Sequence, residues 1–185
     1  MRDDRDATVP APGGGRARCD VSPEPASARL TVVRPGSRPE KVQVPLAAEV
    51  LEKIHTAECV EQAVEREVEI RIVGLRNDGD GLAGSLVARR RSGERTATLS
   101  DLRRSVLMQV KADLPLTLPA DAPQAEAALR FTPYTCEPHV LAETKQPFLF
   151  PFTVRLGDDD PVIVDLPIPD DVRAQLQALV QRVCH

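Results

Sequence analysis

Aromatic side chains are scarce in this chain, which has four Phe, one Tyr and no Trp among its 185 residues. Its core must therefore be mostly aliphatic, and 42% of the residues are hydrophobic. Proteins that bind nucleic acid usually combine a basic surface with aromatic side chains that stack on bases. The formal charge of −4 and the shortage of rings therefore predict no nucleic-acid partner.

Long apolar runs are also missing. A membrane-spanning helix needs roughly 18 or more apolar residues, and no such run occurs, so we expect no transmembrane segment. Residues 2–6 are charged and no apolar stretch follows them, which leaves the sequence as it stands without a signal peptide. An exported form would need an N-terminal signal that this sequence does not show.

Catalytic signatures are absent as well. The sequence contains no Gly-x-Ser-x-Gly, P-loop or His-Glu-x-x-His motif. Cys136 and His139 are the one local nucleophile and base pair, and a disulfide at Cys136 would remove it. We therefore expect a protein that is not an enzyme, with no catalytic residue and no cofactor.

Short apolar segments separated by proline and glycine turns predict a mainly β protein. The alternation of Val68, Ile70 and Ile72 with charged residues is typical of a half-buried strand. We expect an Ig-like or related β-sandwich of roughly eight to ten strands. The expected strands cover residues 28–33, 41–44, 64–73, 84–91, 96–99, 106–112, 128–135, 148–156 and 162–168.

Two short helices are expected in addition, at about residues 47–58 and 170–183. The Pro- and Gly-rich residues 1–27 read as a flexible tether. Residues 28–185 read as one sandwich domain.

Two places in the chain resemble each other. Residues 42–46 read Val-Gln-Val-Pro-Leu and residues 164–168 read Val-Asp-Leu-Pro-Ile, and each leads into a predicted helix that closes on a cysteine. Upstream, Cys19-Asp20 and Cys136-Glu137 each precede a predicted hairpin. The order predicts two pseudo-repeats, at about 19–59 and 136–184, although strand–Pro–helix junctions are common enough to arise by coincidence.

The repeat selects one cysteine pairing, Cys19 with Cys59 and Cys136 with Cys184. Disulfides belong to oxidising compartments, so this pairing predicts an extracytoplasmic protein. Each bond would close a loop of roughly 40 to 50 residues, which stabilises the fold by about 4 kcal/mol in the chain-entropy model. Four free thiols in a small cytosolic protein remain an alternative.

A second alternative is a metal site, because every histidine lies near a cysteine. His55 and Cys59 are four residues apart on one helix, and Cys136 and His139 are three apart. Two thiolates and two imidazoles form a tetrahedral set for zinc or copper.

Two surface features have competing interpretations. Arg89, Arg90 and Arg91 form a basic run that either binds an anion or is the solvated face of a hairpin. Every second residue from Phe148 to Phe152 is a phenylalanine, so the three rings lie on one face of the predicted strand. They either form a platform for a ligand or, more simply, belong to the hydrophobic core.

Residues 136–143 read Cys-Glu-Pro-His-Val-Leu-Ala-Glu, followed by Lys145. This segment resembles a Cys-(Asp/Glu)-Pro-His-x-x-Ala-Glu pattern of uncharacterised exported or lipid-anchored β-rich proteins of actinobacteria, and the tail with its hairpin, helix and final cysteine is similar too. The resemblance implies no assigned activity. With the cysteines, it leads us to expect a non-catalytic structural or binding module of the cell envelope, whose partner is an envelope component.

Overall fold

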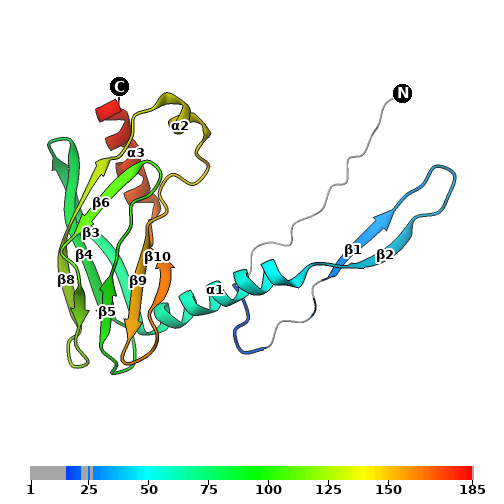
Figure 1. Ribbon diagram of the computed structural model, residues 1–185, viewed down its shortest axis with the longest axis horizontal. Helices are drawn as coiled ribbons and strands as arrows, with labels where there is room; N and C mark the ends of the chain where they lie inside the picture. Colours follow the sequence, from blue (N-terminus) through cyan, green and yellow to red (C-terminus); the bar gives the residue numbers. More distant parts are fainter. Residues whose placement is uncertain (1–15, 22–24, 26, 185) are drawn as a thin grey trace. The chain divides into compact units, whose positions relative to one another are not determined.

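The computed structural model describes residues 16–21, 25 and 27–184 of the chain, which form ten strands and three helices (Figure 1). The helices are α1 (Ala48–Glu67), α2 (Pro138–Glu143) and α3 (Asp170–Cys184). The strands are β1 (Ser27–Val32), β2 (Glu40–Pro45), β3 (Val68–Asp78), β4 (Gly81–Arg90), β5 (Ala97–Ser100), β6 (Met108–Ala112), β7 (Leu116–Leu118), β8 (Gln124–Pro133), β9 (Pro151–Leu156) and β10 (Val162–Asp165). The protein is mainly β, as the sequence predicts.

The chain forms two compact units, the first ending at Cys59 and the second beginning at Val60. In the first unit β1 and β2 pair only with each other, as an antiparallel hairpin. The eight other strands belong to the second unit, so the sandwich begins at β3 and not at residue 28 as the sequence suggested. The tether predicted over residues 1–27 lies mostly outside the described residues.

The second unit is a β-sandwich of two four-stranded antiparallel sheets. One has the strand order β3-β4-β8-β6 and the other β10-β9-β5-β7. The core between them is largely aliphatic, with Phe131 and Phe150 in edge-to-face contact at 5.3 Å between ring centroids. Phe148 and Phe152 are also buried, so the three alternating Phe side chains belong to the core and not to a ligand platform.

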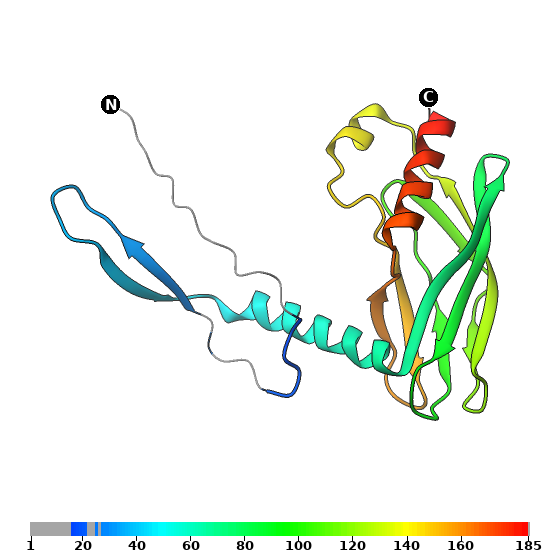
Figure 2. The same ribbon diagram turned by 180° about the vertical axis from the view of Figure 1, so that it is seen from behind.

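Helix α3 completes this core. Strands β3, β4 and β8 have 10 or 11 residues each, whereas the strands of the other sheet have three to six. Figure 2 shows that α3 continues from the end of β10, and it packs on β4 and β8 of the longer sheet. Its buried stripe is made by Val172, Leu176, Leu179 and Val180.

Helix α1 differs from the prediction, because it continues to Glu67 instead of ending near residue 58. Val60 and Val64 are spaced as on one helix face, and Val64 is 4% exposed. The strand predicted from residue 64 therefore starts at Val68. Cys59 consequently lies within its helix, whereas Cys184 ends α3. The two predicted repeats share a strand–strand–helix order, but the second also contains α2 between Cys136 and β9, which has no counterpart in the first.

Both edges of the shorter sheet are bracketed by prolines. Strand β10 lies between Pro161 and Pro167, and β7 lies between Pro115 and Pro119. Proline lacks the backbone N–H that a neighbouring strand would bond, so it is tolerated at sheet edges and limits further pairing there.

Candidate binding site

An open hollow of about 540 Å³ lies where the segment before β6 meets the segment between α2 and β9. The backbone holds these two segments together, since the Arg103 N–H donates to the Pro151 carbonyl oxygen at 2.8 Å. We call this feature the α2 hollow. Its lining residues are Arg104, Ser105, Val106, Thr144, Lys145, Gln146, Leu149 and Pro151.

Apolar side chains are unusually exposed around the α2 hollow. Val106 is 50% exposed and Leu149 is 42% exposed. Tyr134, at 53%, lies beside the hollow because its ring packs on the Arg104 guanidinium, 3.8 Å from the ring centroid. Apolar groups that meet at one concave place are typical of binding surfaces rather than of a random exterior.

Two cations border the same hollow. The Arg104 guanidinium lies over Tyr134 and donates to the Ser105 carbonyl oxygen at 3.3 Å, and the Lys145 side chain is exposed. Neither cation forms an ion pair with a carboxylate of the described chain. Their charge is therefore available to an incoming anion.

The walls of the hollow are held by buried contacts. Ser105 is 5% exposed, and its hydroxyl oxygen accepts from the Met108 N–H at 3.0 Å while its own N–H donates to the Met108 carbonyl oxygen at 2.9 Å. On the other wall the Thr144 hydroxyl donates to the Val140 carbonyl oxygen at the end of α2. The Arg104 side chain thus projects from a fixed turn and not from a loose loop.

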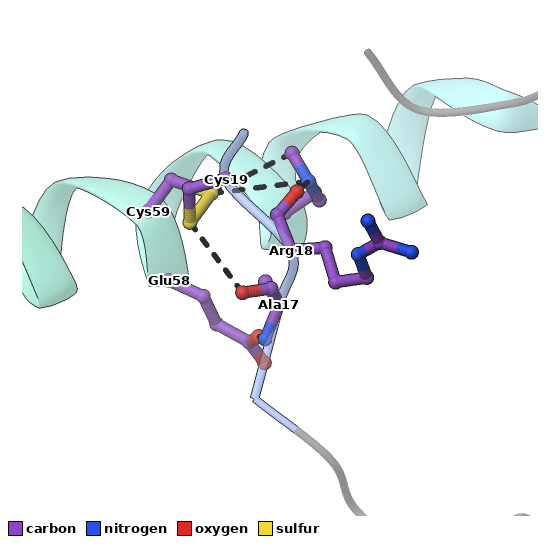
Figure 3. The surroundings of a disulfide bond; sticks show 6 residues. Ala17, Arg18, Cys19, Glu58 and Cys59 are labelled. Carbon is purple, nitrogen blue, oxygen red and sulfur yellow. Dashed lines mark hydrogen bonds between the residues drawn. A yellow bond between two sulfur atoms is a disulfide. The ribbon is translucent and has the colours of Figure 1, made fainter. Parts of the chain in front are cut away.

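The cysteines form the two disulfides that the repeat predicts. Cys136 is bonded to Cys184 with the Cα atoms 5.2 Å apart, which joins the segment before α2 to the end of α3. Cys19 is bonded to Cys59 of α1, with the Cα atoms 5.4 Å apart (Figure 3). Two disulfides indicate an oxidising, extracytoplasmic environment. No helix in the described ranges is both long and apolar enough to cross a membrane.

The alternative metal set loses its thiolates to these bonds. His55 lies against the Cys19–Cys59 disulfide, and its Nε2 is 3.1 Å from the Arg18 carbonyl oxygen. In the same place the Ala17 N–H donates to the Glu58 carboxylate. Figure 3 shows Glu58 beside Ala17. His139 is 82% exposed and lies 3.3 Å from the Glu143 carboxylate. Among residues 16–21, 25 and 27–184, no group of three metal-ligating side chains is close enough to hold an ion.

The basic run does not form one patch. Arg90 is partly buried and donates to main-chain carbonyl oxygens, among them those of Arg95 at 2.9 Å and Pro119 at 2.7 Å. Arg91 binds the Glu69 carboxylate at 3.0 Å, and this hydrogen bond lowers the pKa of Glu69 from its ordinary value. Arg89 alone remains exposed without a partner in the described chain.

Sequence reasoning missed the α2 hollow. Tyr134 and Leu149 belong to the aromatic-rich stretch, and Lys145 follows the motif of the resemblance, but Arg104 and Val106 lie about 30 to 40 residues upstream in a segment without a signature. The adjacency of β6 and β8 in the long sheet brings Arg104 next to Tyr134. One sequence alone does not show which strands pair, so it could not predict that β6 lies beside β8.

Comparison of the chain with protein-family models, with curated proteins and with solved structures finds no significant match. The support for the α2 hollow as a binding site therefore comes only from its shape and from the side chains that line it.

Proposed function

We propose that this protein is a non-catalytic, extracytoplasmic binding module of the cell envelope, and that the α2 hollow takes an anionic ligand with an apolar part. The observation that carries the proposal is the meeting of two cations that no carboxylate of the described chain neutralises with exposed apolar side chains at one concave place. An anion placed there gains charge-assisted hydrogen bonds from Arg104 and Lys145. Val106, Leu149 and Tyr134 cover its apolar part.

The compartment supports this proposal. Two disulfides suit an exported protein. The resemblance of residues 136–143 to exported proteins of actinobacteria agrees with a location at the envelope. The hollow is formed partly by the segment that follows this motif.

Tyr134 provides the measurement, because it is the sole tyrosine and the chain has no tryptophan. Intrinsic emission therefore reports on the edge of the α2 hollow. We expect a sulfated polysaccharide added to the full chain to change the Tyr134 emission in a saturable and salt-sensitive way. An uncharged dextran should leave it unchanged.

The variant Arg104→Gln with Lys145→Gln should weaken binding about ten-fold or more, since two charge-assisted contacts are removed. Arg89→Gln with Arg155→Gln is the matched control for loss of two cations, because both side chains are exposed, lack a partner in the described chain and lie outside the hollow. Its affinity should stay within about two-fold of the wild type. Equal losses in both variants would mean that only the overall charge attracts the polyanion, and the proposal would then fail.

A further inference from the structure

One wall of the α2 hollow belongs to the connection between β8 and β9, which we call the α2 segment (residues 135–149). This wall consists of Thr144, Lys145, Gln146 and Leu149, whereas Arg104, Ser105 and Val106 come from the turn before β6. The hydrogen bonds between Ser105 and Met108 fix that turn. A movement of the α2 segment would therefore change one wall of the hollow and leave the other in place.

The two ends of the α2 segment are bound to the sandwich. Before the segment, the Tyr134 N–H donates to the Leu107 carbonyl oxygen at 2.8 Å. After it, the Phe150 carbonyl oxygen accepts from the Leu166 N–H at 3.0 Å, and Phe150 is fully buried. The main chain is thus fixed at both ends, and the question is what holds the residues between them.

Hydrogen bonding does not hold the middle of the α2 segment to the sandwich. Within the described chain, the hydrogen bonds of residues 137–149 all end within residues 135–144. Helix α2 has six residues and no buried side chain. Helices shorter than roughly 12 residues are marginal in water when nothing supports them. Helix α2 therefore depends on contacts made by its side chains and on its covalent link.

That link is the Cys136–Cys184 disulfide, which joins the α2 segment to the last residue of α3. Figure 1 shows the segment as a long connection that extends from the sandwich beside α3. Val140 and Leu141 also pack against the core, but both are only partly buried. Helix α3 is fixed by its buried stripe, so the disulfide is the strongest tie between the middle of the segment and a rigid element.

The disulfide is open to attack from solvent on one side. Cys136 is exposed, whereas Cys184 is partly buried. Thiol–disulfide exchange begins when a thiolate reaches one of the two sulfur atoms, and access decides which sulfur is attacked. An external thiolate therefore attacks at Cys136.

We propose that the Cys136–Cys184 bond makes the α2 hollow redox-sensitive, because exchange with an external dithiol releases the α2 segment and weakens ligand binding; this inference rests on the proposed function of the hollow. One thiolate of the dithiol bonds to the Cys136 sulfur, the protein S–S bond breaks, and Cys184 leaves as a thiolate that takes up a proton. The second thiol of the dithiol, as its thiolate, then displaces Cys136, which also takes up a proton. The protein disulfide gains two electrons and two protons, and the dithiol is oxidised to a disulfide.

Binding of a sulfated polysaccharide to the full chain, with and without dithiothreitol, tests the proposal. The variant Cys19→Ser with Cys59→Ser leaves Cys136–Cys184 as the sole disulfide, since the chain has four cysteines. Half-saturation of the tyrosine emission should need about ten-fold more polysaccharide after reduction, because ordering the released wall again costs binding free energy. A cooperative thermal transition above the assay temperature shows that the reduced chain remains folded.

The matched control removes the other cysteine pair. Cys136→Ala with Cys184→Ala keeps Cys19–Cys59 and should bind as weakly as the reduced chain, with or without dithiothreitol. A response of this variant to dithiothreitol would assign the effect to the first unit and overturn the proposal.

Lysyl endopeptidase provides a readout that needs no ligand. The chain has four lysines, with Lys41 and Lys53 in the first unit, Lys111 in β6 and Lys145 in the α2 segment. Reduction should speed cleavage after Lys145 about ten-fold or more, because proteolysis follows local opening. In the reduced chain Lys145 should be cut well before Lys111, whose strand stays paired with β8. Equal rates at these two lysines would mean that the whole sandwich opens, and the proposal would fail.

The remaining outcomes separate this proposal from the proposed function. A chain that binds the polysaccharide equally well when oxidised and when reduced overturns the redox proposal and leaves the proposed function standing. A chain that binds in neither state overturns the proposed function and the redox proposal with it. Unchanged cleavage after Lys145 on reduction would show that Val140 and Leu141 hold the segment without the disulfide, which also overturns the redox proposal.

Discussion

Glu69 is a carboxylate whose charge is stabilised by the folded structure. Its carboxylate lies 3.0 Å from the Arg91 guanidinium and 2.7 Å from that of Arg71, and it is 15% exposed. The hydrogen bond from Arg91 lowers the pKa of Glu69, with Arg71 adding to the effect against the opposing cost of burial. This ion pair links strand β3 to Arg91, the residue that follows β4.

A lowered carboxyl pKa has a defined consequence for stability. Between the folded and the ordinary pKa the unfolded chain binds the proton more readily, so the free energy of unfolding rises with pH in that window. The contribution of Glu69 is complete above its ordinary pKa and is lost as the pH falls through the lowered value. We expect the wild type to lose melting temperature below the ordinary Glu range, and Glu69→Gln to lose less over the same interval. Thermal melts recorded across acid pH measure the difference, and parallel curves would contradict it.

His139 shows how a residue that the sequence makes conspicuous can have a minor structural role. In the sequence it stands out because it lies three residues after Cys136, within the Cys136–Glu143 pattern. The structure places it on α2 at 82% exposure, beside Glu143 one turn later. An exposed pair of this kind contributes about 0–1 kcal/mol. A residue type that is rare in the chain, such as histidine here, is therefore not necessarily buried.

Among the elements, α3 gives the clearest energetic contrast. Leu179 is 0% exposed on the face that packs against the longer sheet, whereas Val183, four residues later, is 39% exposed. Leu179→Ala should cost about 2–5 kcal/mol of unfolding free energy, because it leaves a cavity. Val183→Ala should cost less than about 1 kcal/mol on the same helix. Denaturant unfolding measures the loss of unfolding free energy in each variant. Equal losses would mean that α3 does not pack its Leu179 face against the core.

The elements also show what a sequence can predict. Strand β3 and helix α3 follow from their periodicity, since Val68, Ile70 and Ile72 alternate and Val172, Leu176 and Leu179 recur at helical spacing. The end of α1 was predicted wrongly, because Val64 and Val68 fit a helix and a strand equally well. Strand β7 was missed since three residues are too few for any period.

Helix α2 was missed for another reason. It has six residues and no buried side chain, so its sequence shows no apolar stripe at helical spacing. The site depends on such segments, because Lys145 and Gln146 follow α2 directly. The core elements of this protein are therefore more predictable than the elements that form its hollow.

At the scale of the whole molecule, the two disulfides stabilise different parts. They close loops of similar length, with sequence separations of 40 and 48, so their entropic contributions to a cooperative fold would be alike. Cys136–Cys184 joins two elements of the sandwich, whereas Cys19–Cys59 lies in the unit without buried residues in the described chain.

We therefore expect unequal effects from equal substitutions. Replacing Cys136 and Cys184 by Ser should destabilise the sandwich by about 2–5 kcal/mol. The same change at Cys19 and Cys59 should alter sandwich unfolding by less than about 1 kcal/mol, because no described residue of the first unit belongs to the buried core. Denaturant titration with tyrosine emission follows the sandwich alone, as Tyr134 lies within it. Equal losses would show that the units unfold together.

The proline-bracketed edges have a consequence for crowded conditions. Fibrils grow when a free strand templates the same strand of the next molecule in a cross-β stack. In this sandwich β7 offers three residues between Pro115 and Pro119, and β10 is enclosed by Pro161 and Pro167. Those edges offer little unpaired backbone for such stacking, so we expect this sheet to resist edge-to-edge aggregation when the protein is concentrated.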